Sequence, residues 1–204
     1  MDISLFFTIA FSAILVSNFV LSKFLGLCPF VGVTQKTESA IGMGIAVTFV
    51  MFLAALATSL LYNLVLVPHD LAVLKTPMFI LVIAALVQLV ELFMRARMPA
   101  LHGALGIYLP LITTNCAVMG VALLGTSDAP ARFAELSVAG RVTAAAWQGI
   151  CGGVGFVLAM LLMSGIRERL DRADLPAPLR GMPIAFVCTG LMAMAFLGFA
   201  GMVS

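Results

Sequence analysis

Residues 26–33 read Gly-Leu-Cys-Pro-Phe-Val-Gly-Val, and residues 114–121 read Thr-Asn-Cys-Ala-Val-Met-Gly-Val. The two stretches share Cys, Gly and Val at their third, seventh and eighth places, which puts Cys28 and Cys116 in equivalent positions. Each stretch interrupts a long apolar run with Gly, Pro, Thr or Asn. Paired breaks of this kind in the two halves of a membrane protein point to its functional centre. A centre with two thiolates indicates metal or redox chemistry rather than solute binding.

The composition assigns the whole chain to a membrane. Of its 204 residues, 63% are hydrophobic and 10% are charged, whereas a soluble domain carries about 25% charged residues. The mean hydropathy is +1.18. A formal net charge of only +2 argues against nucleic acid as a partner. The chain begins Met1-Asp2 without a basic signal-peptide region, so we expect its first apolar stretch to stay in the mature protein.

Charge-poor windows predict six transmembrane segments and no soluble domain. A helix needs about 20 apolar residues to cross the hydrocarbon core of a bilayer. The windows are residues 3–22, 40–67, 71–94, 98–127, 142–166 and 181–204. We therefore expect an all-α integral membrane protein with a single membrane domain, residues 1–204.

Six segments divide into two repeats of three, approximately residues 1–97 and 98–204. An odd number of segments per repeat reverses the insertion of the second repeat, so the two are related by an axis in the membrane plane. The first and fourth segments then correspond, and both are broken at their Cys motifs. The axis would bring Cys28 and Cys116 together near the middle of the membrane.

The basic residues predict the orientation of these segments. Lys and Arg in short loops favour the cytoplasm. The first, third and fifth connections hold eight of the 11 basic residues: Lys23, Lys36, Arg95, Arg97, Arg167, Arg169, Arg172 and Arg180. The other side holds Lys75, Arg132 and Arg141. Both termini should therefore face away from the cytoplasm.

Cysteine and histidine positions limit the kind of centre that the chain can hold. Cys151 and Cys188 lie in apolar helical patterns, where a reduced Cys packs as a small hydrophobe. Structural zinc and two-iron clusters both need four protein ligands. His69 and His102 have no metal-ligand spacing to a Cys, so they do not complete a site. The residues alone predict half of a Cys-ligated centre, with the remaining ligands on a second chain and the metal left open.

Non-helical backbone inside a membrane needs partners for its polar groups. Asn18, Thr113, Thr114 and Asn115 flank the two breaks and are candidates to bond either the freed backbone groups or the sulfurs of a cluster.

Two other classes of function remain open at this point. Inverted repeats with broken helices are equally typical of a small-solute permease without a redox centre. The stripe Ala145-x-x-x-Gly149-x-x-x-Gly153 lets helices approach closely, and it would also suit a purely structural assembly subunit.

Four runs resemble the A-type membrane subunit of Rnf electron-transport complexes, within the Rnf/Nqr family. They are Asn18-Phe-Val-Leu-Ser-Lys-Phe-Leu-Gly-Leu-Cys-Pro-Phe30, Leu105-Gly-Ile-Tyr-Leu-Pro-Leu-Ile-Thr-Thr-Asn-Cys-Ala117, Ile166-Arg-Glu-Arg-Leu170 and Asp174-Leu-Pro-Ala-Pro-Leu-Arg-Gly181. The Leu-Cys-Pro-Phe and Thr-Thr-Asn-Cys-Ala runs are specific to this family, and the resemblance covers essentially the whole chain. The alternative within the family is the E subunit of the sodium-pumping NADH:quinone reductase, against which Pro29 and Thr114 argue.

The resemblance implies a role in a bacterial inner membrane, with both termini periplasmic. Family members pair with a homologous six-helix subunit of opposite orientation (the E type), alongside other Rnf subunits. The pair holds one [2Fe–2S] cluster, for which Cys28 and Cys116 would give two of the four ligands. The complex moves electrons between ferredoxin and NAD and couples this to Na⁺ or H⁺ translocation. This chain would then be one component of a redox-driven ion translocase, and it would bind no nucleotide and have no catalytic residues of its own.

Overall fold

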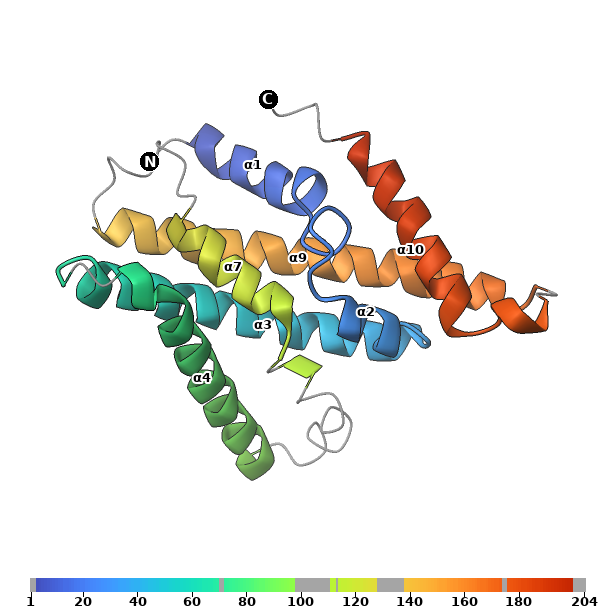
Figure 1. Cartoon of the computed structure of the whole chain (residues 1–204), viewed down its shortest axis with the longest axis horizontal. Coiled ribbons are helices and arrows are strands. Elements are labelled where there is room, and N and C mark those ends of the chain that lie inside the picture. Colours follow the sequence, from blue (N-terminus) through green and yellow to red (C-terminus); the bar gives the residue numbers. More distant parts are fainter. Residues whose placement is uncertain are drawn as a thin grey trace.

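The computed structural model describes residues 3–69, 72–97, 111–112, 114–127, 138–173 and 176–199, and within these ranges the chain is helical and contains no strand. In chain order the elements are α1 (Ile3–Phe11), η1 (Ser12–Val16), α2 (Leu27–Val33), α3 (Thr37–Leu61), η2 (Tyr62–Leu66), η3 (Ala72–Leu74), α4 (Lys75–Arg97), α7 (Cys116–Ser127), α9 (Val138–Leu170), η4 (Ala177–Leu179) and α10 (Met182–Leu197) (Figure 1). The all-α prediction is confirmed for the described residues.

Three of the described helices are long and apolar enough to cross a membrane, namely Thr37–Leu66, Lys75–Leu92 and Val138–Leu170. Shorter apolar helices cover Phe6–Val16, Cys116–Thr126 and Met182–Leu197. Each of the six predicted windows thus contains an apolar helix, while six complete crossings stay a prediction. Residues 98–110 and Thr113 of the fourth window, with His102 among them, and Arg132 of the following connection lie outside the described residues.

An antiparallel pair of long helices, α3 and α9, forms the centre of the fold (Figure 1). Their close approach depends on glycines of α9. A Cβ on Gly153 would lie only 2.5 Å from Thr48 Cγ2 and 2.8 Å from Thr48 Cα, and one on Gly149 would lie 3.0 Å from the Met51 carbonyl oxygen. The small-residue stripe therefore packs against another helix, as its spacing predicts, and that helix belongs to the same chain.

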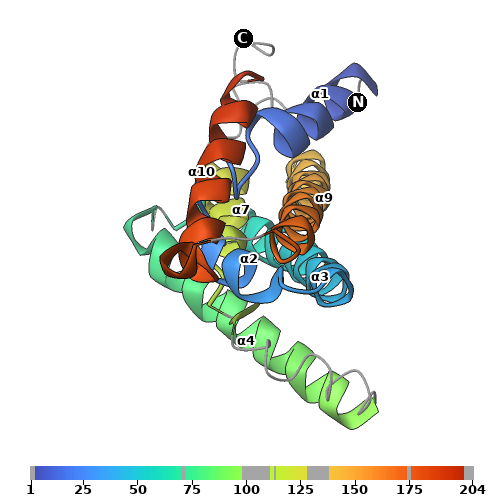
Figure 2. The same ribbon diagram turned by 90° about the vertical axis from the view of Figure 1, so that its right-hand side faces the viewer.

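Glycines on another face of α9 pack against the first predicted segment, residues 3–22. A Cβ on Gly152 would lie 2.6 Å from Phe19 Cε2, and one on Gly155 would lie 3.1 Å from the Ala13 carbonyl oxygen. Figure 2 shows α9 between α1 and α3. The helix is glycine-rich on two faces because backbone from both sides comes within contact distance of it.

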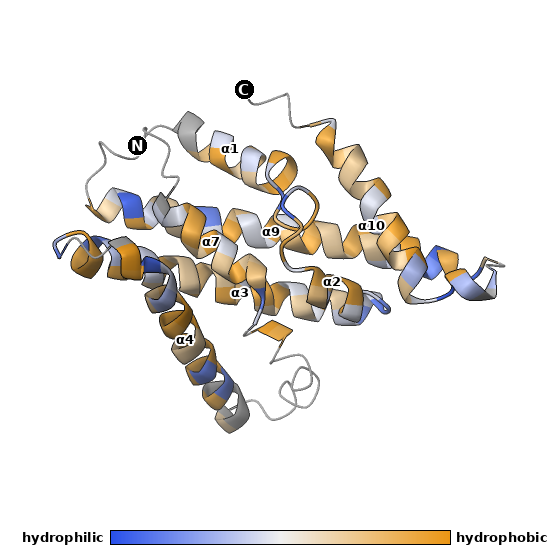
Figure 3. Cartoon of the chain, viewed as in Figure 1, coloured by the Kyte–Doolittle hydropathy of each residue, from blue (hydrophilic) through white to orange (hydrophobic). Residues whose placement is uncertain are grey.

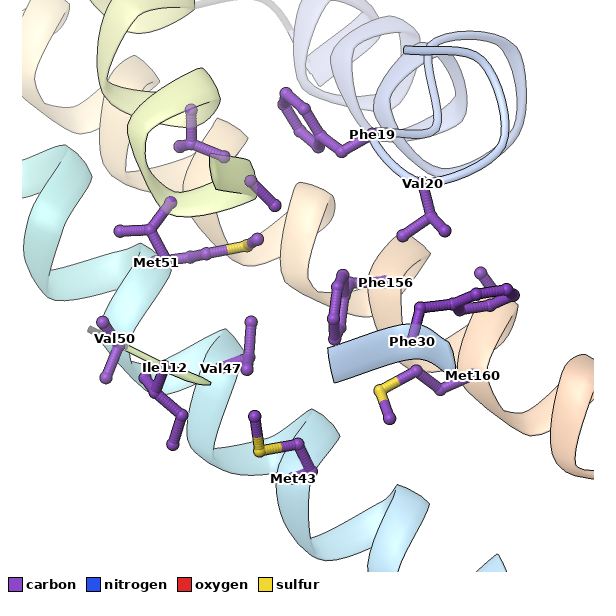
Figure 4. Packing of buried hydrophobic residues seen from close by; sticks show 14 of the residues in the cluster. Phe19, Val20, Phe30, Met43, Val47, Val50, Met51, Ile112, Phe156 and Met160 are labelled. Atoms are coloured by element: carbon purple, nitrogen blue, oxygen red, sulfur yellow. The ribbon is translucent and has the colours of Figure 1, made fainter. Parts of the chain in front are cut away.

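Apolar side chains from α2, α3 and α9 fill the space beside this pair (Figure 4). Phe30, Met43, Val47, Phe156 and Met160 are all fully buried there. The cluster fixes the short helix α2 against the two long helices, and so it fixes the position of the first Cys motif.

Hydrophobic residues occur along all of the helices (Figure 3), and many of them are exposed. Large side chains such as Leu81 and Leu89 on α4 and Phe186 and Leu191 on α10 are more than half exposed. A soluble monomer rarely shows apolar surface on this scale, whereas a surface in contact with lipid does. The exposed side chains therefore agree with the membrane assignment made from composition.

Candidate metal centre at the paired breaks

The first break spans residues 17–26, where the chain leaves the helical conformation after η1. Asn18, which is fully buried, satisfies the freed backbone groups. Its Oδ1 accepts hydrogen bonds from the N–H groups of Val20 (3.0 Å) and Leu21 (3.4 Å), and its Nδ2 donates to the Gly155 carbonyl oxygen at 2.8 Å. Asn18 thus bonds backbone groups, one of the two roles predicted for it.

The break precedes Cys28 instead of including it. Phe24 and Gly26 adopt left-handed φ angles of 55° and 83°, which redirect the chain so that α2 can begin at Leu27. The helix tolerates Pro29 because a first-turn residue has no helical acceptor for its N–H. Cys28 therefore lies in the first turn of a helix, whereas its motif predicted a position on broken backbone.

The second break ends in the same way. Asn115 is buried, and its Oδ1 accepts a hydrogen bond from the Ala117 N–H at 3.0 Å, so it caps α7. Cys116 is the first residue of α7. Both Cys residues thus lie in the first turn of a helix, after a break that a buried Asn stabilises.

The two breaks touch each other. The Gly26 N–H donates a hydrogen bond to Cys116 Sγ at 2.9 Å. A Cβ on Gly26 would lie 2.9 Å from Phe156 Cε2 and 3.1 Å from both Ala117 Cβ and Asn115 Oδ1. Together with its φ of 83°, these contacts favour glycine at this position. The structure therefore brings the two Cys motifs side by side, although 90 residues separate Gly26 from Cys116 in the chain.

The four cysteines differ in accessibility. Cys28 and Cys116 are free and exposed, Cys151 is buried and Cys188 is partly buried. The last two pack in or against the apolar core, as their helical patterns predict. The thiols at the paired breaks face outward, where a group held by another chain can reach them.

The donor set near the breaks is incomplete for a metal. Within the described part of the chain, no group of three or more His, Cys, Asp or Glu side chains could hold an ion. Two soft thiolates suit iron–sulfur or zinc chemistry but supply half of the usual four ligands. The hydrogen bond from Gly26 is of the kind that tunes the potential of a cluster. Asn115 Nδ2, in the residue before Cys116, is a buried donor without a partner among the described residues.

No role for Gly26 was predicted from the sequence. The only sequence feature that pointed to Gly26 was its place in the first Cys motif, two residues before Cys28. Its function could not be inferred from spacing, because its hydrogen-bond partner belongs to the other half of the chain.

Replacing Asn18 with Ala should destabilise the fold around the first break. The change leaves the N–H groups of Val20 and Leu21 without their acceptor and removes the bonds that Nδ2 donates to the Ile14 and Gly155 carbonyl oxygens. We expect a loss of about 1–3 kcal/mol in the free energy of unfolding. Thermal unfolding of the assembled protein in detergent measures this. Asn63→Ala is the control, because among the described residues Asn63 bonds only Ser59, one helical turn away. Equal effects of the two changes would contradict the role given to Asn18.

Comparisons with known proteins identify the family to which the chain belongs. Residues 6–203 match the family described as Rnf-Nqr subunit, membrane protein. The chain is 52% identical over 194 residues to the A subunit of the Na⁺-translocating ferredoxin:NAD⁺ oxidoreductase complex of Acetobacterium woodii, a match that covers 95% of this chain and 96% of the relative. It is 51% identical over 197 residues to the A subunit of the ion-translocating oxidoreductase complex of Cereibacter sphaeroides, covering 97% of each. The protein of the same name from Cronobacter sakazakii is 53% identical over 190 residues, 93% of each chain. The chain therefore belongs to the Rnf-Nqr family of membrane protein subunits.

Proposed function

We propose that this chain is the A subunit of an ion-translocating ferredoxin:NAD oxidoreductase complex. Its role there is to relay electrons across the bilayer through a [2Fe–2S] cluster shared with a homologous subunit. The observation that carries the proposal is the contact between the two breaks, in which the Gly26 N–H bonds Cys116 Sγ beside the exposed Cys28. The names of the relatives supply the complex and its substrates.

The residues at the paired breaks fit half of such a cluster. Cys28 and Cys116 would hold one side of it, and two thiolates of the partner would complete the four ligands that a two-iron cluster needs. Gly26 and Asn115 would present N–H donors to the sulfur atoms. The bound cluster supplies one-electron redox chemistry, which suits a relay better than hydride transfer. This chain binds neither nucleotide nor flavin in this account, and the chemistry at both membrane faces belongs to other subunits.

The lengths of the two helices that start at the breaks support a site inside the membrane. The 7-residue α2 ends near Arg167 of α9, and the 12-residue α7 leads toward Ala145, near the opposite end of α9. At 1.5 Å per residue they extend roughly 10 Å and 18 Å. Together these lengths approach the roughly 30 Å of a bilayer core. A redox centre at this depth divides the distance across the membrane into two shorter electron transfers.

The same directions support two inverted repeats with six crossings. In Figure 1, α2 and α7 extend from the paired breaks toward opposite ends of the α3–α9 pair, as helices of oppositely oriented repeats would. In this account the chain is a multi-pass protein of the bacterial inner membrane, and its partner is a homologous six-helix subunit of E type.

Both termini should be periplasmic. An alkaline phosphatase fused after Ser204 should be active, and a fluorescent protein that folds only in the cytoplasm should stay dark at the same position. The reason is that the connections rich in Lys and Arg stay in the cytoplasm, which places both termini on the other side of the membrane. The reverse pattern of activity would contradict the orientation.

The spectrum of the purified complex tests the function itself. The chain, isolated together with its membrane partners, should show visible absorption and an EPR signal from a [2Fe–2S] cluster that ferredoxin reduces. A small-solute permease predicts no chromophore at all. Absence of iron and sulfide from an intact complex that retains this chain would exclude the redox relay.

A further inference from the structure

A second polar site lies away from the Cys motifs, where the α2–α3 turn, the end of α9 and the start of α10 meet. The cavity there has a volume of about 590 Å³, within the range of small-molecule sites. Three basic side chains line it, from Lys36, Arg167 and Arg180. Asp171 is the one acidic residue among its lining residues in the described part of the chain. Among these described lining residues, basic side chains therefore outnumber acidic ones.

Arg167 gives this charge a fixed position. Its side chain is only 7% exposed, and its Nη1 donates to the Val31 carbonyl oxygen at 2.7 Å and to Thr34 Oγ1 at 3.1 Å. Both acceptors are neutral, and in the described part of the chain no carboxylate forms an ion pair with Arg167. A guanidinium stays charged under all ordinary conditions, and a buried charge without a counter-charge is costly. An anion in the cavity would supply that counter-charge.

The position of the cavity indicates where the anion comes from. It lies at the ends of α3, α9 and α10, all of them apolar helices, and so at the boundary between membrane and water. Beside it, the first two turns of α10 expose Met182, Phe186 and Val187 by 50% or more. The chemistry that fits both features is a phosphate group attached to apolar chains.

The start of α10 is open toward the cavity. Its N-cap residue Gly181 lines the cavity and provides no side-chain cap, and a Cβ there would meet nothing within 4 Å. The first amide groups of the 16-residue α10 add partial positive charge to that of the three cations.

We propose that this cavity binds the phosphate group of an anionic phospholipid, whose acyl chains lie along α10. Basic pockets at the ends of membrane helices bind such headgroups through charge. The site would tie α2, α9 and α10 together at one membrane face. It is independent of the cluster, so either proposal stands if the other fails.

Binding of labelled phosphatidylglycerol to the delipidated complex tests the site. The double variant Lys36→Gln/Arg180→Gln should raise the dissociation constant about 10- to 30-fold, the change expected for two cations near a membrane surface. Arg167 is left in place because it also bonds the end of α2. The matched control is Arg169→Gln/Arg172→Gln, which removes two exposed cations at the same end of α9 that do not line the cavity. The control should change the constant less than 3-fold.

Competition distinguishes the sources of phosphate. Unlabelled phosphatidylglycerol should displace the probe, whereas phosphatidylcholine and millimolar inorganic phosphate should not. Full displacement by inorganic phosphate would overturn the lipid in favour of a soluble anion. Equal dissociation constants in the wild type and the cavity variant would overturn the site altogether. Loss of a partner protein from that variant, with lipid binding unchanged, would show a protein contact and overturn the proposal as well.

Discussion

Cys28→Ser and Cys116→Ser should each abolish the [2Fe–2S] signal of the assembled complex and the transfer of electrons from ferredoxin to NAD. Each change removes one of the four thiolates that hold the cluster. A hydroxyl is a poor replacement for a thiolate on iron, so the loss should be close to complete. Low-temperature EPR and the rate of ferredoxin-dependent NAD reduction measure the two effects.

Cys151→Ser provides the control within the same chain. Cys151 is buried in α9, away from the paired breaks, so its replacement should leave the cluster signal intact, as should Cys188→Ser. Flavins on other subunits should still be present in all four variants, which shows that the complex assembles. An unchanged signal in Cys28→Ser would refute the assignment of the ligands.

Gly153→Leu should have the second largest effect, on the stability of the fold itself. A Cβ at this position would lie 2.8 Å from the Thr48 Cα, so the α3 helix would have to move away. Overpacking of a core typically costs about 1–3 kcal/mol, and a contact with backbone is less easily relieved than one with a side-chain tip. We expect reduced yield of the complex and a lower melting temperature in detergent.

Gly165→Leu is the matched control for Gly153→Leu. Gly165 lies on the same helix, and a Cβ there would meet nothing within 4 Å. The two variants have the same change in helix propensity and side-chain size, and they differ only in the facing surface. Similar melting temperatures and yields for both would remove the packing role of the stripe.

The distribution of apolar residues predicted the helical class well and the ends of the helices less well. The fifth window ended at residues 142 and 166 because charges stand at Arg141 and Arg167. The helix α9 instead covers Val138–Leu170. Arg167 remains within it because α2 offers the Val31 carbonyl oxygen to its guanidinium. A window of hydropathy contains no information about such a partner from another part of the chain.

The first window was too long, whereas the fifth was too short. It ran to residue 22, but the helical conformation ends at Val16. The following backbone can leave the helix because Asn18 bonds Val20, Leu21 and the distant Gly155. By composition, the residues after Val16 still belong to the apolar window of a transmembrane helix. The break is stable because Asn18 bonds Gly155 of α9, a contact that the local composition does not reveal.

The candidate site was predictable to the extent that the chain repeats itself. The shared motif identified Cys28 and Cys116 from their positions alone. The hydrogen bond of Gly26 to Cys116 Sγ was not predictable, because it depends on how the two halves pack. The other half of the ligand set lies, in our proposal, on another polypeptide.

Iron and acid-labile sulfide, measured per chain, test the shared cluster most directly. The chain purified alone should contain neither in stoichiometric amount, because it offers two of the four ligands. The complex with the homologous subunit should contain two irons and two sulfides that both Cys28→Ser and Cys116→Ser remove. A stoichiometric cluster in the chain purified alone would contradict the account.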